Sequence, residues 1–328
     1  MNRLRIIVTG GAGFIGSHTV DRMLGSGCEV VAVDNLSSGR AENLSRASKR
    51  ESFRFEYGDV TEPGFLESLG TRYRPDAIVH LAGLVSVIRA NQEPDLNFRL
   101  NVDATRIVAE AARNAGIGRI VFASSAAVYG DSTPLPCGES QPCRPINLYG
   151  AAKSSSEQLL LGYGETFGID TIPLRFFNVF GPRQDPASPY SGVLSIFARR
   201  LAQKRAIEVF GDGRQTRDFI SVFDVARAVE LAATCHAVPS VPMNVCTGRP
   251  SSLLEVLETL RRIDSRMPDP IFSPARSGEI LHSRGCPETA AENLRFRSEI
   301  SLERGLRNLL GVPVQEQTPS SPLLEQVA

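Results

Sequence analysis

A glycine-rich turn directly after the first apolar run constrains this chain more than any other feature. Leu4–Val8 is a short β-branched run that predicts a buried strand, and Gly16–Gly25 carries apolar residues at helical spacing. Between them, Gly10, Gly13 and Gly16 follow the spacing Gly-x-x-Gly-x-x-Gly. Glycines in such a turn let the backbone approach a pyrophosphate, whose charge the N-terminus of the following helix then binds. The turn therefore predicts a strand, a dinucleotide-binding loop and a helix, in that order.

Short apolar runs alternate with helical patterns along the first half of the chain. The further predicted strands are Glu29–Val33, Phe53–Tyr57, Ala77–Leu81 and Ile120–Ala123, and Asn101–Ala115 is a predicted helix. Strand–helix–strand alternation favours parallel strands joined by right-handed crossovers. We therefore predict the α/β class, with a doubly wound parallel sheet of the Rossmann type.

After residue 175 the pattern loosens, and breaks such as Gly181-Pro182 and Asp185-Pro186 divide the chain into loops. Helical patterns follow over 191–204 and 252–263, and a helix over Asp224–Ala233 is predicted to return to the main sheet. We predict a nucleotide-binding domain over 1–175, with about 214–238 returning to it. Residues 176–213 and 239–312 then form a smaller substrate-binding lobe, and 313–328 is a predicted flexible tail.

Composition argues against several classes of function. The 36 basic and 36 acidic residues give a net charge of zero, which removes the electrostatic footprint of a nucleic-acid or membrane-surface binder. No run approaches the roughly 18 apolar residues of a membrane span, and the N-terminal residues lack a signal-peptide pattern. The six cysteines are scattered without a Cys-x-x-Cys pair, so we predict reduced thiols, no metal site and a cytoplasmic protein.

Asp34 ends the second predicted strand, 18 residues after Gly16. An acidic residue about 20 residues beyond a glycine-rich turn accepts hydrogen bonds from the adenosine ribose and repels a 2′-phosphate. The sequence therefore predicts NAD rather than NADP, with Arg40 as a solvated surface charge. Two residues leave alternatives open. Asp59 contacts the adenine amine or caps a helix, and His80 is a core histidine or a catalyst.

A serine-bearing strand end and a Tyr-x-x-x-Lys pair supply the candidate chemistry. Ser124 and Ser125 follow the strand that begins at Ile120, while Tyr149 and Lys153 lie four residues apart on one face of a predicted helix. A phenol with its ordinary pKa near 10 is a poor base, but a neighbouring ammonium and a positive nicotinamide ring favour the phenolate. Such a phenolate can remove a proton from a carbinol oxygen while the carbinol hydride leaves for nicotinamide, with a serine relaying the proton.

Together, Gly10–Gly16, Asp34, His80–Gly83, Ser124–Gly130 and Tyr149–Lys153 resemble the extended short-chain dehydrogenase/reductase superfamily. Within it, the chain is similar to the nucleotide-sugar 4-epimerases of the UDP-glucose and UDP-N-acetylglucosamine kind, from residue 4 to about 310. The segments Arg175–Pro186, Gly213–Ile220 and Asn244–Gly248 extend the likeness. The resemblance implies NAD as cofactor, a UDP-sugar as substrate, and a homodimer formed through helices around 101–115 and 150–166.

The resemblance also implies roles for individual residues. Ser125, Tyr149 and Lys153 would be catalytic, with Tyr149 as the base and Lys153 as the ribose clamp. The residues implied to bind the cofactor are Gly10, Gly13, Phe14, Ile15, Gly16, Asp34, Asn35, Ser38, Gly39, Asp59, Val60, Leu81, Ala82, Gly83, Asn101, Ser124, Tyr149 and Lys153. Those implied to bind the substrate are Ser86, Ser125, Asn178, Val193, Val209, Phe210, Arg217, Arg276 and Ser283. Of these, Arg217 and Arg276 would pair with the diphosphate, which suits a planar guanidinium, and Val209 and Phe210 would lie against the uracil.

The residues after Ser125 distinguish related reactions. Relatives resembling the 4,6-dehydratases carry Asp-Glu directly after the catalytic hydroxyl residue, and decarboxylases carry Glu there, because elimination of water needs a further acid and base. Ala126 and Ala127 hold these positions here. The resemblance therefore implies epimerisation at C4 of UDP-glucose and UDP-galactose through a transient 4-keto intermediate. Ser283, a small residue at the position that gates the sugar pocket, extends this prediction to UDP-GlcNAc and UDP-GalNAc.

Three alternatives stay open. The first is a UDP-glucuronate 4-epimerase or another nucleotide-sugar epimerase of the same family. The second is a net oxidoreductase that reduces a keto-sugar, which would turn over free NADH as an epimerase would not. The third is a non-catalytic NAD-binding regulator, although such a protein has no use for the intact Ser125, Tyr149 and Lys153.

Overall fold

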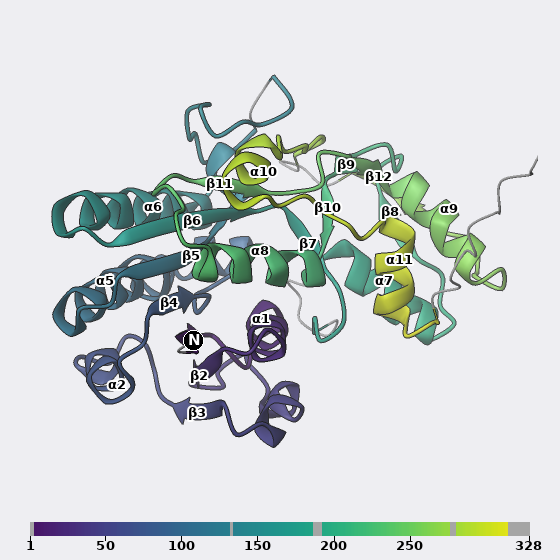
Figure 1. Cartoon of the computed structure of the whole chain (residues 1–328). Coiled ribbons are helices and arrows are strands. Elements are labelled where there is room, and N and C mark those ends of the chain that lie inside the picture. The colour runs from purple at the N-terminus through teal and green to yellow at the C-terminus, as the bar shows by residue number, and fades with distance from the viewer. Residues whose placement is uncertain (1–2, 132–133, 186–191, 276–279, 314–328) are drawn as a thin grey trace, which may run out of the picture.

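A parallel sheet of seven strands forms the centre of the chain in a computed structural model, which describes residues 3–131, 134–185, 192–275 and 280–313 (Figure 1). Its strand order is β11-β6-β5-β4-β1-β2-β3. The strands are β1 (Arg5–Thr9), β2 (Glu29–Asp34), β3 (Phe53–Tyr57), β4 (Ala77–His80), β5 (Arg119–Ser125), β6 (Asp170–Phe176) and β11 (Met243–Val245). The order reverses between β1 and β4, where ligands of such sheets bind beyond the carboxyl ends of the strands. The predicted doubly wound α/β fold is confirmed.

Helices cover both faces of the sheet because its strands are apolar on both sides. One face carries α1 (Phe14–Gly25), α8 (Val222–Thr234) and α10 (Glu288–Leu294), which share one buried apolar core. The other face carries α2 (Phe65–Tyr73), α5 (Ala104–Ala115) and α6 (Leu148–Phe167), which share a second core. As predicted for Asp224–Ala233, α8 returns to the main sheet, where it packs beside α1.

The connection from β4 to α5 is more irregular than the sequence predicts. It contains α3 (Val87–Gln92), α4 (Pro94–Phe98) and the π-turn η3 (Arg99–Asp103), so the predicted helix Asn101–Ala115 begins only at Ala104. The widened turn presents the Asn101 carbonyl to two hydroxyls, those of Thr105 at 2.6 Å and Ser156 at 2.9 Å. Because Ser156 belongs to α6, these bonds hold the Asn101 turn against that helix. Three short 3₁₀ turns lie elsewhere: η1 (Ala41–Leu44), η2 (Ala47–Lys49) and η4 (Ala126–Tyr129).

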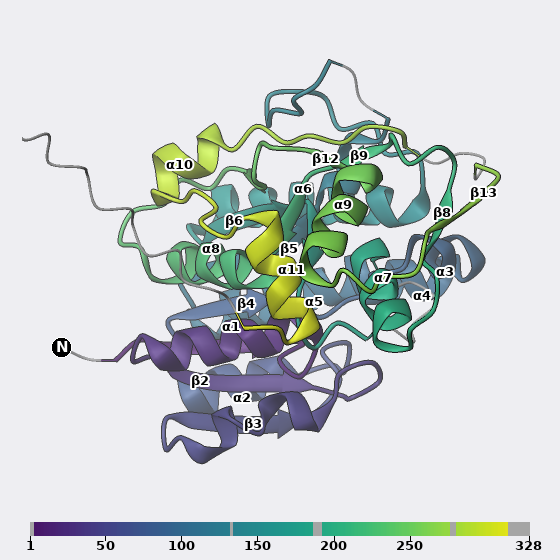
Figure 2. The same ribbon diagram turned by 90° about the vertical axis from the view of Figure 1, so that its right-hand side faces the viewer.

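A smaller lobe is built from three two-stranded ladders and three helices (Figure 2). The ladders pair β7 (Asn178–Phe180) with β10 (Phe219–Ser221), β9 (Thr216–Arg217) with β12 (Ser251–Ser252), and β8 (Glu208–Phe210) with β13 (Ile271–Ser273). The helices α7 (Val193–Ala202), α9 (Leu253–Ile263) and α11 (Leu302–Leu310) pack around a third apolar core. A capping box between Ser252 and Glu255 sets the start of α9.

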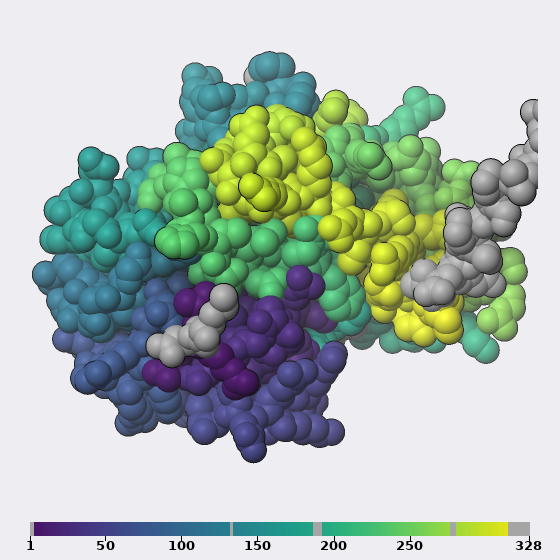
Figure 3. Space-filling model, viewed as in Figure 1, coloured from purple at the N-terminus to yellow at the C-terminus, as the bar shows by residue number. Residues whose placement is uncertain are grey.

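The predicted lobe boundary at residue 239 is wrong. β11 pairs in parallel with β6 and extends the main sheet, and Ala290 and Leu294 of α10 are buried in the core shared with α8. The chain then leaves the main sheet again, and α11 joins the smaller lobe, as the yellow segments show (Figures 1 and 3). The sequence does not reveal this because three residues of strand are too few for a periodic pattern. Residues 314–328 of the predicted tail lie outside the described residues.

Candidate active site

The turn between β1 and α1 requires glycine at two positions. Gly10 has φ +68°, and a Cβ there would lie 2.7 Å from the Ala82 backbone nitrogen. A Cβ on Gly16 would lie 2.0 Å from the Gly10 carbonyl oxygen. α1 begins at Phe14, two residues earlier than predicted, and its N-cap Gly13 supplies no side-chain hydrogen bond. The first-turn amides of α1 therefore stay available to an anion, which fits a pyrophosphate.

Asp34, at the end of β2, is hydrogen-bonded to the backbone beside this turn. Its carboxylate accepts hydrogen bonds from the backbone nitrogens of Ala12 at 2.9 Å and Leu36 at 2.8 Å. A Cβ on Gly39 would lie 2.8 Å from each Asp34 carboxylate oxygen, so the close approach of the two residues depends on glycine. The remaining lone pairs of the carboxylate fit ribose hydroxyls. Arg40 forms an exposed ion pair with Asp185 at 2.7 Å, in line with its prediction as a surface charge.

Of the residues predicted to bind the adenosine, Asn35 and Asp59 contact each other, whereas Ser38 and Val60 differ from this pair in exposure. Asn35 donates to Asp59 at 2.9 Å, so these two lie together beside Asp34. Burial opposes ionisation of Asp59, but hydrogen bonds from Thr61 and Asn35 outweigh it and hold the pKa of Asp59 below its ordinary value. Both alternatives for Asp59 remain open, because the same carboxylate caps the Thr61 turn at 2.8 Å. Ser38 is exposed, and the Val60 side chain lies in the apolar core, which leaves only the backbone of Val60 for a cofactor.

Lys153 of α6 is buried beside the loop after β4. A Cβ on Gly83 would lie 2.6 Å from Asn101 Oδ1 and 3.6 Å from Lys153 Nζ, so the three residues converge. Lys153 is 4% exposed, and we find no hydrogen bond between its Nζ and another described residue; the buried Asn101 Oδ1 has no hydrogen-bond partner among them. Burial lowers the pKa of Lys153 to about 8, although the Glu157 carboxylate acts in the opposite direction. Unpartnered buried polar groups indicate a ligand, and the ribose hydroxyls of NAD fit these two.

Tyr149 lies one helical turn before Lys153 and is 9% exposed. Its phenol lies near the Ser125 hydroxyl, which accepts the Ala127 backbone N–H at 3.1 Å. Burial raises the pKa of Tyr149 above its ordinary value, and the nearby Ser125 hydroxyl offsets only part of that rise. Lys153 Nζ lies 5.9 Å from the Tyr149 ring centroid. The predicted lowering of the Tyr149 pKa by the ammonium together with the nicotinamide ring stays a prediction.

Local contacts determine where α6 starts and so where Tyr149 points. The Asn147 side chain accepts the Gly150 N–H at 2.8 Å and caps the helix. A Cβ on Gly150 would lie 2.5 Å from the Ala127 carbonyl oxygen, so the helix packs directly on η4. The Asn97 side chain donates to the Leu148 carbonyl at 3.0 Å. The first turn of α6 is thus held against the strand end that carries Ser125.

Ser124 and His80 have hydrogen-bond partners within the fold. The Ser124 hydroxyl donates to Glu157 and is buried, and the contact of Ser124 with the cofactor stays a prediction. Of the two alternatives for His80, a core histidine or a catalyst, the structure favours the core histidine. It shares a hydrogen bond with Thr9 at 2.8 Å, and burial and the Lys153 charge lower the pKa of His80 to about 3. Leu81 and Ala82 follow β4 beside the glycine turn, and both are half-buried.

Arg217 and Ser283 meet in the smaller lobe. The Ser283 backbone N–H donates to the Thr216 carbonyl at 3.1 Å, and Arg217 Nη1 donates to the Leu281 carbonyl at 3.1 Å. Two strand-like segments from distant parts of the sequence therefore place the predicted diphosphate ligand beside the predicted gate. Arg276, the second predicted diphosphate ligand, lies outside the described residues.

The other predicted substrate residues differ in availability. Asn178 is exposed at the start of β7, and Phe210 is half-buried at the end of β8. Val209 is 1% exposed and its side chain belongs to the core of the smaller lobe, which leaves its backbone for the predicted contact with the uracil. Val193 also packs on this core, and the buried Ser86 caps α3 by accepting the Arg89 N–H at 3.0 Å.

Asp218 is a residue that sequence reasoning missed. Its fully buried carboxylate accepts the backbone N–H groups of Thr247 at 2.8 Å, Gly248 at 2.9 Å and Gly285 at 3.2 Å, and the Thr247 hydroxyl at 2.6 Å. These bonds tie the strand bearing Arg217 to the segment that follows Ser283. An acidic residue directly before the apolar Phe219-Ile220 is the sequence sign that points to it.

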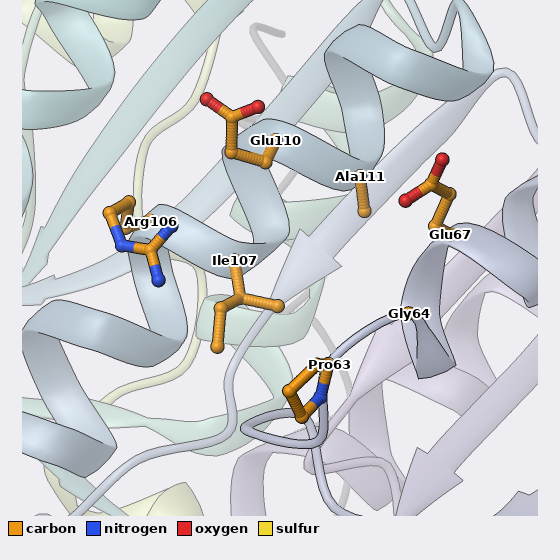
Figure 4. A pocket seen from close by; sticks show the side chains of 7 residues that line it. All are labelled: Pro63, Gly64, Glu67, Arg106, Ile107, Glu110 and Ala111. Atoms are coloured by element: carbon orange, nitrogen blue, oxygen red, sulfur yellow. The ribbon is translucent and has the colours of Figure 1, made fainter.

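Two hollows lie away from these residues. A cavity of about 190 Å³ lies between α2 and α5 and is lined by Pro63, Gly64, Glu67, Arg106, Ile107, Glu110 and Ala111 (Figure 4). A second of about 400 Å³ lies by α1, α8 and α10, where Arg22 pairs with Glu230 and Arg227 with Asp224. Neither contains a predicted site residue. No described helix is long and apolar enough to cross a membrane.

The glycine turn, Asp34 and the buried Tyr149–Lys153 pair define a Rossmann-fold enzyme of the extended short-chain dehydrogenase/reductase class. Residues 6–246 match the NAD dependent epimerase/dehydratase family, and the chain belongs to that family. The predicted family and the predicted NAD dependence are thus confirmed.

Relatives with curated names and solved structures agree with this assignment. The UDP-glucose 4-epimerase of Mycolicibacterium smegmatis is 38% identical over 304 residues, which cover 92% of this chain and 96% of the relative. The structure of UDP-glucose 4-epimerase from Thermotoga maritima with UDP-glucose has a TM-score of 0.88 and 33% identity, covering 94% of this chain and 98% of that one. A UDP-N-acetylglucosamine 4-epimerase from Methanobrevibacter ruminantium has a TM-score of 0.89 and 34% identity, covering 95% and 98%.

Proposed function

We propose that this chain interconverts the C4 epimers of a UDP-hexose, with UDP-glucose and UDP-galactose as substrates, through a transient 4-keto sugar. The observation that carries the proposal is the apolar wall around the Tyr149 phenol. Tyr149 packs with Leu84 and Ala90, and Ala127 and Leu100 lie against them. Loss of water or of carbon dioxide needs a further acid or base at this wall, and Ala126 and Ala127 supply neither.

The roles follow from the contacts of each residue. When bound, NAD supplies the acceptor and then the donor of the C4 hydride. The Tyr149 phenolate takes the proton of the C4 hydroxyl and, as the phenol, later returns it, while the Ser125 hydroxyl hydrogen-bonds both oxygens. The Lys153 ammonium binds the nicotinamide ribose, which satisfies its buried N–H groups. Because nothing is consumed, the reaction leaves no net NADH.

UDP-GlcNAc and UDP-GalNAc belong to the proposed substrate range because the resemblance places Ser283, a small residue, at the gate of the sugar pocket. Its backbone is held by Thr216, so a larger side chain at 283 cannot be relieved by a shift of the strand. We expect Ser283→Tyr to lower turnover of the N-acetylated sugars at least about tenfold and to leave UDP-glucose turnover within about twofold, a difference of some 1 kcal/mol. Equal loss with both substrates would reject the gate.

A time-resolved proton NMR assay with purified protein tests the proposed function. UDP-glucose, UDP-GlcNAc and UDP-glucuronate are supplied in separate samples without added reductant, and absorbance at 340 nm is followed in parallel. Appearance of the 4-epimer of UDP-glucose with no net NADH supports the proposal, and Tyr149→Phe serves as the inactive control. Conversion of UDP-glucuronate alone would identify a UDP-glucuronate 4-epimerase instead. Stoichiometric consumption of NADH would identify a reductase.

We also infer that the active form is a homodimer that uses the outer faces of α5 and α6. Leu160 belongs to the core, but its neighbours Leu159 and Leu161 are only half-buried, and Phe167 is 48% exposed beneath Arg113. These side chains leave apolar area along α6 accessible. Light scattering coupled to gel filtration should give twice the chain mass, and Leu161→Glu should give the monomer.

A further inference from the structure

A buried ion pair lies behind the candidate active site and is not used by the proposed chemistry. Arg175 of β6 donates from Nε to Glu157 Oε1 at 2.9 Å and from Nη2 to Glu157 Oε2 at 2.7 Å. The two side chains are 3% and 0% exposed. Such a pair contributes little net stability because both charges lose their hydration. The other contacts of Glu157 therefore indicate what this buried pair does.

Glu157 also holds the strand that carries Ser125. The Ser124 hydroxyl donates to Glu157 Oε1, across 33 residues of sequence. β4 pairs with β5 only as far as Phe122, so residues 123–125 have a ladder with β6 alone. The Ser124–Glu157 bond is thus the second restraint on a strand end that β4 does not reach. Ser125 follows directly, and its hydroxyl meets Tyr149.

Glu157 is, in addition, the carboxylate on the same helical face as Lys153, four residues away. The other groups that face Lys153 are His80 of β4, which is neutral, and the Tyr149 phenol of α6. Burial lowers the pKa of Lys153 to about 8, and Glu157 is the group that opposes this shift. Without that carboxylate, more of the lysine would be uncharged at neutral pH.

We propose that Glu157 is the positioning residue of this site: held by Arg175, it fixes the Ser124–Ser125 strand end and keeps Lys153 charged. The positioning of Ser125 for catalysis rests on the proposed epimerase function, whereas the charge state of Lys153 does not. Glu157 itself touches no reacting atom. Two variants separate its two effects, since Glu157→Gln removes the charge but retains an oxygen acceptor, and Ser124→Ala removes the hydrogen bond but retains the charge.

The chain offers a direct readout for Lys153, because it contains only three lysines, Lys49, Lys153 and Lys204. With lysine labelled with ¹³C at Cε, an NMR titration follows Lys153 beside the exposed Lys49 and Lys204. In Glu157→Gln, the midpoint of Lys153 should fall by about one further unit. In Ser124→Ala it should not move. An unchanged Lys153 midpoint in Glu157→Gln overturns the charge role.

The strand end has its own reporter in the Ala127 amide, which donates to Ser125 Oγ at 3.1 Å. In Ser124→Ala, hydrogen exchange at Ala127 should accelerate at least about fivefold, and epimerase kcat should fall about tenfold with KM nearly unchanged. The control is Thr171→Val on β6, which removes a buried hydroxyl that has no hydrogen-bond partner, and it should leave all three readouts unchanged. Wild-type exchange at Ala127 in Ser124→Ala overturns the positioning role.

The possible outcomes remain distinguishable. If Glu157→Gln does not fold because Arg175 is left unpaired, Glu157→Gln combined with Arg175→Met removes both charges. The Lys153 midpoint should then fall in the same direction but by less, because the guanidinium that repels the ammonium is lost as well. A wild-type chain that converts no UDP-sugar contradicts the proposed function, yet the lysine titration and the Ala127 exchange still decide the role of Glu157.

Discussion

The Lys153 ammonium lies 4.8 Å from the centroid of the Phe122 ring. Phe122 is the last residue of β5 that pairs with β4. A cation over an aromatic face is stabilised by the ring quadrupole. This contact therefore supports a charge that burial otherwise disfavours, and it does so without a hydrogen bond. Together with Glu157, Phe122 lets the chain keep an ammonium inside the protein.

We expect Phe122→Leu to lower the Lys153 pKa by about half a unit to one unit, because a cation–π contact contributes about 0.5–2 kcal/mol and one unit corresponds to about 1.4 kcal/mol. The ¹³C lysine titration measures this shift. Phe55→Leu is the matched control, since Phe55 is 37% exposed and no cation–ring contact involves it among the described residues. A Lys153 midpoint that stays in place or rises in Phe122→Leu would contradict the assignment.

Gly39→Ala should reduce NAD affinity at least about tenfold. The new Cβ would lie 2.8 Å from both carboxylate oxygens of Asp34, so the carboxylate must turn away from the ribose position. Cofactor retained after gel filtration, followed by calorimetric titration with NAD, measures the effect. Gly25→Ala at the end of α1 is the control, because no atom lies within 4 Å of the added Cβ. Equal NAD affinity in both variants would show that Asp34 does not bind the cofactor.

Asp218→Asn should destabilise the smaller lobe by about 2–3 kcal/mol, because an amide nitrogen would face N–H donors that now meet a carboxylate. Chemical denaturation measures the loss. With UDP-glucose, we expect KM to rise more than kcat falls. The reason is that the Asp218 carboxylate connects the strand that carries Arg217 to the segment that follows Ser283. Asp212→Asn, at an exposed position, should change stability by less than about 0.5 kcal/mol. If Asp218→Asn has the same free energy of unfolding as the wild type, the role of this buried carboxylate is contradicted.

Stability should fall as the pH drops from 6.5 towards 4, partly because of His18. Burial lowers the pKa of His18 from 6.5 to about 4, although its ring hydrogen-bonds the Pro182 carbonyl at 3.0 Å. In that range the unfolded chain binds a proton that the folded chain does not, so the folded state loses stability as the pH falls. The contribution of His18 between pH 6.5 and 4.5 is roughly 2 kcal/mol.

His18→Gln tests this expectation, because it keeps a donor for the Pro182 carbonyl but cannot titrate. Urea unfolding at pH 6.5 and 4.5 should show a smaller difference for this variant than for the wild type. His236→Gln, at an exposed position, is the control and should keep the wild-type difference. An undiminished difference in His18→Gln would assign the effect to other groups, His80 first among them.

The sequence by itself predicts the local features of this site. The strand before Gly10, the helix after Gly16 and the common face of Tyr149 and Lys153 all follow from patterns within about ten residues. They depend on the period of strand and helix and on what glycine permits, and these are properties of short segments. For the same reason the α/β class and the NAD-binding turn can be predicted from a single chain.

Only the tertiary structure decides what each side chain meets. Ser124 and Ser125 are adjacent and chemically identical, yet the first donates to Glu157 and the second accepts the Ala127 N–H beside Tyr149. Likewise, Asp218 receives a hydrogen bond from Gly285, 67 residues away, and β11 joins the main sheet rather than the smaller lobe. The free energy of such contacts depends on burial and on the competing partners that packing brings near. Those quantities belong to the whole fold, and no local pattern in the sequence carries them.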